Sequence, residues 1–237
     1  MSQKVKWMLL VGGVLYFVWM VVAAMLPILP SPWPPFYWAL PVHGQVIDAD
    51  TGQPLEGVIV AAHWELRDTG WTGSPVGQVA VMEDVTDNKG AFTFRWWRPR
   101  LRWRFWGLLR SDAPGMLFFR SGYKWASCSN HRVNYIYFPF PSSDCDGAII
   151  KLKKFQGSEL EYVKNVEQLD RELEFAFDHH DCSWKKIPRM LVAMDAEGTR
   201  LAAVQGYRTI HSLETRADRA NERWCGSIKK YLGSYAP

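Results

Sequence analysis

The sequence predicts an α+β protein with an apolar N-terminal helix, an antiparallel β-sandwich and a small helical region at the C-terminal end. Three observations support this prediction. The 23 residues from 7 to 29 include no charged side chain. From residue 42, apolar and polar residues alternate with a period of two, which is typical of half-buried strands. From residue 157, apolar residues recur every three or four positions, which is typical of helices with one buried face.

The composition is that of a folded protein. Hydrophobic residues make up 48% and charged residues 22% of the 237 positions, which excludes a disordered or fibrous chain. The net charge of +4 is too small to indicate nucleic-acid binding, so we expect no nucleic-acid partner. We expect five parts: a cytoplasmic N-terminus (1–6), a transmembrane signal-anchor (7–29), a proline- and aromatic-rich linker (30–41), a β-sandwich (42–155) and a helical domain (157–234).

The apolar segment 7–29 is long enough to cross a bilayer, which needs about 20 helical residues. Lys4 and Lys6 precede it without any acidic residue, so the N-terminus is expected in the cytoplasm and the rest outside. Val22-Ala23-Ala24 could serve as a signal-peptide cleavage site. The apolar run continues beyond it, which favours an uncleaved anchor. We therefore expect a single-pass protein of a bacterial inner membrane, with most of the chain periplasmic or extracellular.

The linker 30–41 is dense in proline, which cannot continue a helix and favours stiff, extended chain. Its aromatic side chains suit a membrane–water interface. They could equally dock on the domain that follows. Both interpretations stay open for Trp33, Phe36, Tyr37 and Trp38.

All four cysteines lie beyond the membrane segment, and an even number in an exported region indicates disulfides. The favoured pairs are Cys128–Cys145 and Cys182–Cys225, because each pair then falls within one expected domain. Zinc is the rival interpretation, but no two cysteines have the C-x-x-C spacing of zinc sites. We expect no cofactor and no metal.

The β region begins with a strand over 42–48 and a turn over 50–55, after which 57–61 resumes a strand. A hairpin is predicted next. Its strands are 81–86 and 91–94, and its turn is Asp87-Asn88-Lys89-Gly90.

These strands and turns contain two linked motifs, Gly44-x-Val46-x-Asp48-x-x-Thr51-Gly52-x-Pro54-Leu55-x-Gly57-Val58-x-Val60 and Thr86-Asp87-x-x-Gly90-x-Phe92-x-Phe94. With Gly122-Tyr123 and the closing strand 149–152, the region from about 42 to 155 resembles the carboxypeptidase regulatory-like domain family. The resemblance implies a transthyretin-like β-sandwich with no catalytic set of its own. Because such modules are attached to many different proteins, it does not specify a function.

The sequence contains only weak candidates for catalytic or metal-binding motifs. His211 and Glu214 have the His-x-x-Glu spacing of zinc carboxypeptidases, but no third histidine follows them. His179 and His180, flanked by Asp178 and Asp181, could ligate a metal. Adjacent residues seldom converge on one ion, so we expect a polar turn there. We therefore expect no enzyme.

The most distinctive feature is the Arg–Trp segment, residues 95–106. In a strand, alternate residues share a face, so its four alternating arginines would line one side. Such a ribbon could contact anionic lipid headgroups, dock an acidic partner or stack sugars on its tryptophans. It could also be an edge strand whose arginines prevent aggregation while its aromatic residues fill the core. The candidate interaction residues are Arg95, Trp96, Trp97, Arg98, Arg100, Arg102, Trp103, Arg104 and Trp106.

The C-terminal region is predicted to be helical. A capping box at Ser158 and Glu161 precedes a stripe of Tyr162, Val166, Leu169, Leu173 and Phe177. A second helix is expected from Trp184 or Pro188 to Glu197, with Gly198 as its stop. A third is expected over 211–232, and 199–207 is ambiguous between helix and strand. The third helix would bury Leu213, Ala217, Ala220, Trp224 and Ile228. The helices are expected to pack on each other or on the sandwich.

These features together predict a non-catalytic, membrane-anchored envelope protein. It would act as a scaffold or accessory subunit through its sandwich and its Arg–Trp segment. The expected partners are the membrane, with a possible anionic-lipid contact, and another envelope protein. One alternative is a carbohydrate or cell-wall binding module, and a further alternative is an unrecognised hydrolase.

Overall fold

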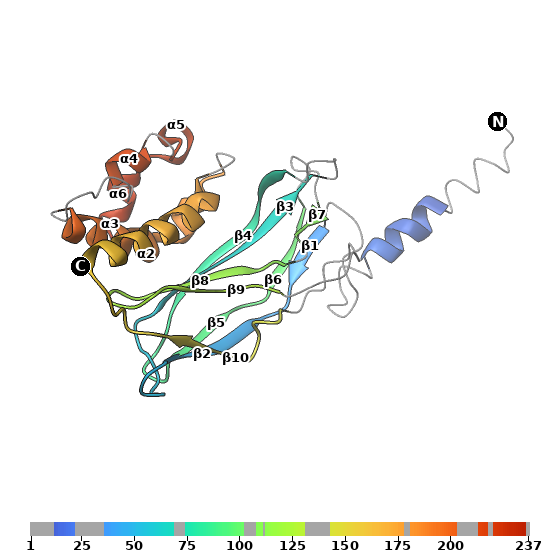
Figure 1. The fold of residues 1–237 in the computed structure, drawn as a ribbon. Coiled ribbons are helices and arrows are strands. Elements are labelled where there is room, and N and C mark those ends of the chain that lie inside the picture. The colour runs from blue at the N-terminus through green and yellow to red at the C-terminus, as the bar shows by residue number, and fades with distance from the viewer. Residues whose placement is uncertain are drawn as a thin grey trace, which may run out of the picture.

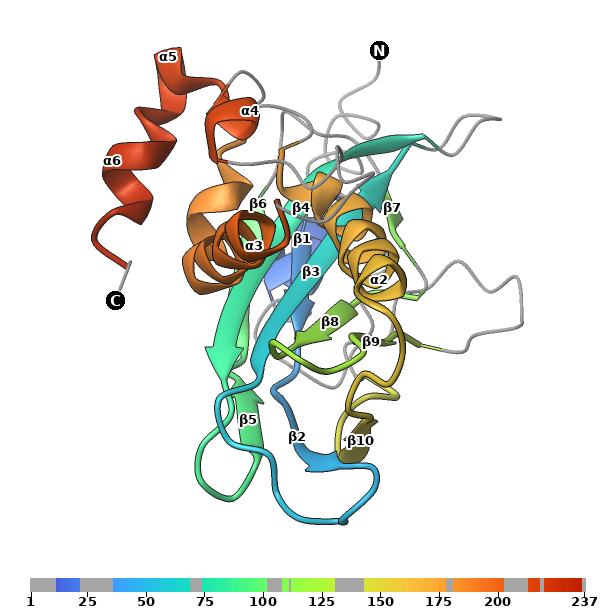
Figure 2. The same cartoon turned by 60° about the vertical axis from the view of Figure 1, so that its left-hand side comes forward.

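The computed structural model describes residues 12–21, 36–68, 74–101, 108–110, 112–130, 143–177, 181–202, 213–217 and 220–235. Two β-sheets pack face to face, and a layer of helices covers the outer face of one of them (Figure 1). Figure 2 shows α2 and α3 lying across strands β3 and β4. The fold is α+β, as predicted.

The first sheet has β2 (Val42–Asp48) at its centre, between β5 (Ala91–Phe94) and β10 (Ala148–Leu152). β5 is antiparallel to β2, but β10 is parallel to it. The prediction of a wholly antiparallel sandwich is therefore wrong at this strand. A parallel pair needs a long crossover rather than a tight turn, and the whole second sheet lies between β2 and β10 in the chain.

The second sheet has the order β4 (Pro75–Val85), β3 (Ile59–Arg67), β8 (Gly115–Phe119), β9 (Ala126–Cys128). The short β7 (Leu108–Leu109) extends it by pairing with the end of β3. The predicted hairpin is wrong. Both of its strands exist, but β4 pairs with β3 whereas β5 pairs with β2, so the turn crosses from one sheet to the other.

A third, two-stranded ribbon joins β1 (Phe36–Ala39) to β6 (Trp97–Leu101). β1 lies inside the stretch expected to be linker, and Tyr37 and Trp38 are buried in the core between the sheets. The aromatic residues at these two positions therefore dock on the domain that follows. The other expected linker aromatics, Trp33 and the side chain of Phe36, lie outside the described part.

The helical layer comprises α2 (Glu159–Glu172), η1 (Leu173–Ala176), η3 (Ser183–Lys186), α3 (Pro188–Leu201), α4 (Leu213–Ala217), α5 (Glu222–Cys225) and α6 (Ile228–Leu232). The capping box of Ser158 and Glu161 is confirmed at the start of α2. The apolar residues of this layer form one core with the sheet residues Ala61, Val81, Leu117 and Phe119. The layer therefore packs on the sandwich, one of the two arrangements expected for it.

One long-range contact attaches α3 to the sheet. Ile187 offers no side-chain cap at the start of α3. The carboxylate of Glu83, on β4, instead accepts hydrogen bonds from the backbone N–H groups of Arg189 and Met190, at 3.1 and 2.7 Å. A carboxylate is favourable at this positive end of a helix. Burial nevertheless raises the pKa of Glu83, and the two backbone hydrogen bonds offset that effect only in part.

Two helix predictions are wrong in detail. Gly198 lies inside α3 rather than at its end, because the helix continues to Leu201. The expected third helix appears among the described residues as three short helices, α4, α5 and α6. Trp224, predicted to face inward, is 80% exposed, whereas Ala220 and Ile228 are buried as predicted.

Within the described residues, no helix is both long and apolar enough to span a bilayer. Of the segment 7–29, only residues 12–21 belong to the described part, and they are helical. The rest of that segment, and residues 1–6, lie outside it.

Candidate functional site

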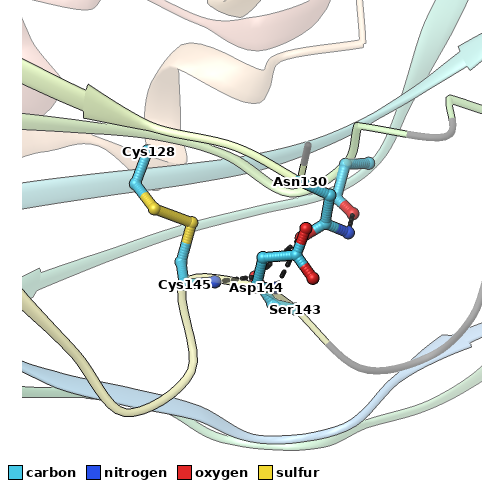
Figure 3. The surroundings of a disulfide bond; sticks show 6 residues. Cys128, Asn130, Ser143, Asp144 and Cys145 are labelled. Carbon is cyan, nitrogen blue, oxygen red and sulfur yellow. Dashed lines mark hydrogen bonds between the residues drawn. A yellow bond between two sulfur atoms is a disulfide. The ribbon is translucent and has the colours of Figure 1, made fainter. Parts of the chain in front are cut away.

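Both predicted disulfides are confirmed, and they fasten different parts of the fold. Cys128–Cys145, with Cα atoms 6.1 Å apart, joins β9 of one sheet to the turn before β10 of the other (Figure 3). Cys182–Cys225, with Cα atoms 5.5 Å apart, joins the residue before η3 to the end of α5. A disulfide typically contributes about 2–4 kcal/mol by restricting the unfolded chain.

Asn130 reinforces the first disulfide. Its side-chain Nδ2 donates to the carbonyl of Ala113 at 2.8 Å. Its Oδ1 accepts from the backbone N–H of Asp144 at 2.7 Å and from the hydroxyl of Ser143 at 3.2 Å (Figure 3). The two chain segments that meet at Cys128–Cys145 are thus joined by hydrogen bonds as well as by the disulfide bond.

The first sequence motif stabilises a turn. Asp48 Oδ1 accepts hydrogen bonds from the backbone N–H groups of Asp50 and Thr51, and Oδ2 accepts from the hydroxyl of Tyr123 at 2.9 Å. The hydrogen bond from Thr51 is the main cause that lowers the pKa of Asp48, followed by that from Tyr123. These polar groups are occupied in fixing the turn that follows β2.

The second motif stabilises the crossing between the sheets. Thr86 donates its hydroxyl proton to the carbonyl of Leu55 and accepts from the backbone N–H of Val58, at 2.7 and 2.8 Å. Gly90 has a positive φ of 70°, and a Cβ there would lie 2.3 Å from the carbonyl oxygen of Val46. The motif residues are therefore explained by backbone geometry and not by a binding site.

A pocket of about 160 Å³ lies on the outer face of the second sheet, beside the end of α2 and next to Cys128. We call it the His63 pocket. Its polar lining comes from β3, β9, the loop after β7 and α2. The residues concerned are His63, Glu65, Arg110, Asp112, Ser127, Glu172 and Ser129, which follows β9.

His63 is held firmly in this pocket. Its ring stacks on Phe175 with centroids 4.0 Å apart, and its Nδ1 lies 3.2 Å from Oε1 of Gln78. It pairs across the sheet with Gly115, where a Cβ would lie 2.6 Å from Nε2, so only glycine leaves room for the ring. Burial lowers the pKa of His63, which favours a neutral imidazole. With Nδ1 donating to Gln78, Nε2 is left as an acceptor.

Three charged groups of the His63 pocket, Glu65, Arg110 and Asp112, form ion pairs. Arg110 Nη1 lies 3.0 Å from Glu65 Oε2, and Arg110 Nε lies 2.6 Å from Asp112 Oδ1. Arg67 Nε lies 3.4 Å from the other oxygen of Glu65. Since Glu65 is buried, these pairs offset the cost of removing its charge from water.

Within the part of the chain that the structure describes, no hydrogen bond links His63 to the pocket residues Ser127 and Ser129. His63 has no hydrogen bond to a hydroxyl or thiol there, and its hydrogen-bonding partner is Gln78. Serine hydrolases need a nucleophile within reach of the imidazole. The same described residues contain no group of three or more His, Cys, Asp or Glu side chains placed to hold a metal ion.

The predicted interaction residues of the Arg–Trp segment differ in exposure, and some of them lie outside the described residues. Trp97 is buried and packs edge-on against Trp64, with ring centroids 5.8 Å apart, so its prediction as a contact residue is wrong. Arg95 and Trp96 are exposed. Arg98 and Arg100 lie on β6. Outside the described residues lie Arg102, Trp103, Arg104 and Trp106.

Of the residues considered for metal chemistry, His179, His180 and His211 lie outside the described residues, as does Asp178. Asp181 accepts a hydrogen bond from the backbone N–H of Ser183, as in an ordinary turn.

The His63 pocket was not among the sites predicted from the sequence. One signal was present, because His63 and Glu65 stand two residues apart in a stretch with strand character. Gln78, Arg110 and Asp112 could not have been added, because their proximity depends on how β3 pairs with β4 and β7.

No family model matches this chain, and no curated protein matches it. Solved structures that match in part include the 3-chlorocatechol 1,2-dioxygenase from Rhodococcus opacus 1CP, at 14% identity and a TM-score of 0.31. That match covers 49% of this chain and 60% of the dioxygenase. A 9R-lipoxygenase from Cyanothece PCC8801 matches at 12% identity and a TM-score of 0.26, covering 67% of this chain and 26% of the lipoxygenase. At these TM-scores neither likeness bears on fold or function.

Proposed function

We propose that this protein is a non-catalytic, membrane-anchored interaction protein of the bacterial envelope. In this proposal residues 7–29 anchor the chain in the inner membrane. A carboxypeptidase regulatory-like sandwich with its helical layer then acts outside the cytoplasm as a scaffold or accessory subunit. The lysines before the apolar segment support the orientation. The two disulfides support an oxidising compartment.

The main support for a non-catalytic function is that polar groups inside the His63 pocket are paired with one another. Arg110 pairs with both Glu65 and Asp112, and the imidazole of His63 is hydrogen-bonded to an amide instead of a nucleophile. The motif residues Asp48 and Thr86 are likewise occupied by turns. The polar chemistry of the described core therefore serves stability, and recognition is left to the surface.

We assign the main contact to the exposed part of the Arg–Trp segment. Trp97 fastens β6 to the core through Trp64, which holds the neighbouring residues in place. Arg98 and Arg100 both lie on that strand. Residues before Gly157 carry a net charge of +5, whereas the remainder carries −1. The charge therefore suits an acidic partner or anionic lipid near the anchored end.

Crosslinking in native membranes tests this function. The full-length protein is crosslinked, extracted in mild detergent and analysed for stoichiometric partners. A variant with Arg98, Arg100, Arg102 and Arg104 all changed to Gln is expected to lose most of that association and remain folded. The matched control changes Lys151, Lys153 and Lys154 to Gln, because these residues are exposed on and after β10. Unchanged association in the arginine variant, or recovery of the wild-type protein alone, would contradict the proposal.

Trp96 favours a second candidate function, carbohydrate or cell-wall binding. Its side chain is 47% exposed beside the buried Trp97, and flat exposed rings stack on sugars. A peptidoglycan pull-down with Trp96→Ala tests it, with Trp224→Ala as the matched tryptophan control. Retention by peptidoglycan that depends on Trp96 would support this candidate over the scaffold.

A further inference from the structure

A second surface, at the C-terminal helices, has features of a binding site that the proposed function does not use. A hollow of about 360 Å³ lies beside α5 and α6. We call it the α6 hollow. Its lining includes Lys185, Ser227, Lys230, Tyr231, Ser234 and the disulfide-bonded Cys225.

The two lysines of the α6 hollow are cations without a countercharge. Neither Lys185 nor Lys230 forms an ion pair with any residue in the described part of the chain. The ammonium of Lys185 lies 5.4 Å from the ring centroid of Tyr231 and 5.5 Å from that of Trp184. These aromatic faces hold the charge in place without neutralising it. The hollow therefore presents positive charge in a fixed position.

An exposed tryptophan, Trp224, immediately precedes Cys225 of the α6 hollow. Trp224 is 80% exposed, although Cys225, the next residue, is 3% exposed in its disulfide with Cys182. Consecutive helical residues point about 100° apart. The disulfide fixes Cys225 inward and so directs Trp224 to solvent. A tryptophan on a rigid support beside cationic groups has the composition of an interaction hot spot.

We propose that the α6 hollow and Trp224 bind an acidic segment of a partner protein. Carboxylates of the partner contact Lys185 and Lys230, and an apolar side chain of the same segment packs on Trp224. Charge complementarity selects an anionic occupant. Figure 1 places α5 and α6 on the side of the molecule away from β1, where the chain enters the sandwich from the N-terminal segment. Because an anchor at 7–29 would hold the membrane on the β1 side, a protein is favoured over a lipid surface; this choice rests on the proposed function.

Site-directed photo-crosslinking in native membranes tests the proposal with the full-length protein. Ser234, which is exposed and lines the hollow, is replaced by p-benzoylphenylalanine, and the adducts are mapped by mass spectrometry. We expect an adduct to a protein segment rich in Asp or Glu. The adduct yield should fall about tenfold with Lys185→Glu plus Lys230→Glu, and similarly with Trp224→Ala. Each change is also made alone, so that a folding defect in the double variant does not decide the outcome.

The matched controls are Lys151→Glu plus Lys153→Glu for charge and Leu160→Ala for an exposed apolar side chain on α2, and both should leave the adduct unchanged. An adduct to lipid, an adduct to a segment without acidic residues, or an adduct insensitive to the hollow variants would overturn the inference. The same probe placed at Trp96 reports on the Arg–Trp segment. Partners captured there with none at Ser234 would overturn this inference and leave the proposed function intact.

Discussion

The tight turns of the sandwich and the attachments of the helical layer depend on contacts of different range. In the sandwich, short-range contacts fix the turns, as Asp48 does for the amides of Asp50 and Thr51. Asp87 does the same for the amides of Lys89 and Ala91. Such contacts leave a recognisable local motif in the sequence.

The helical layer depends on partners far apart in the chain. Glu83 caps α3 from β4. Glu197 of α3 accepts a hydrogen bond from Ser121, and Arg216 of α4 forms a buried ion pair with Asp170 of α2. Contacts of this kind leave no local signature. The difference shows that a clear sequence motif indicates short-range backbone geometry. It does not indicate how stable the region that contains it is.

The largest expected effect is on the buried pair of Asp170 and Arg216, whose side chains are 1% and 4% exposed. We expect Arg216→Ala to lower the free energy of unfolding by about 3–5 kcal/mol, because it leaves a buried carboxylate without its countercharge. Urea unfolding followed by circular dichroism measures this. The control, Asp170→Leu with Arg216→Met, should recover most of the loss. A single variant with wild-type stability would show that the layer does not depend on this pair.

A smaller effect is expected in the sandwich. Gly90 and Gly52 both have a φ of +70°, but a Cβ at Gly90 would meet the Val46 carbonyl, whereas nothing lies within 4 Å of one at Gly52. We expect Gly52→Ala to cost about 1–2 kcal/mol from backbone strain alone. Gly90→Ala should cost more, because the chain must also move. Thermal unfolding of the two variants compares them directly, and equal losses would refute the clash.

The smallest effect is a difference in acid response between the two regions. The pKa of Asp48 is lowered, so its stabilisation is present above the ordinary value of 3.8 and is lost as the pH falls through the folded value. The pKa of Glu83 is raised, so its contribution is greatest below 4.5 and is lost as the pH rises through the folded value. The free energy of unfolding is measured from pH 3 to pH 7 and plotted against pH. Compared with the wild type, the plot should be flatter below pH 3.8 for Asp48→Asn and flatter above pH 4.5 for Glu83→Gln. Identical pH profiles for both variants and the wild type would contradict these assignments.

Much of the fold could be predicted because its signals are local. Strand alternation placed β2, and Ser158 with Glu161 placed the start of α2. The position of the cysteines within expected domains gave both disulfides.

The predictions that failed concern elements whose structure depends on residues distant in the chain. The strands before and after Asp87–Gly90 have hairpin character, but packing of the core assigns them to different sheets. Asn221, with a left-handed φ of 50°, precedes the single-turn α5, so no continuous helix crosses this point. Trp97 packs on Trp64 in the core, which was one of the two environments expected for it. Trp224 was expected to face inward but is exposed, because the Cys182–Cys225 bond fixes its neighbour Cys225 on the buried side.

The parallel pairing of β2 with β10 sets the order in which the sandwich can be completed. A chain emerges from the ribosome N-terminus first, so β2 is made about a hundred residues before the strand that covers one of its edges. Until residues 148–152 arrive, that edge offers free N–H and C=O groups to any neighbouring strand. Nascent chains halted before residue 148 should therefore be open to strand exchange and to capture by chaperones that recognise extended segments, a vulnerability that ends when β10 docks.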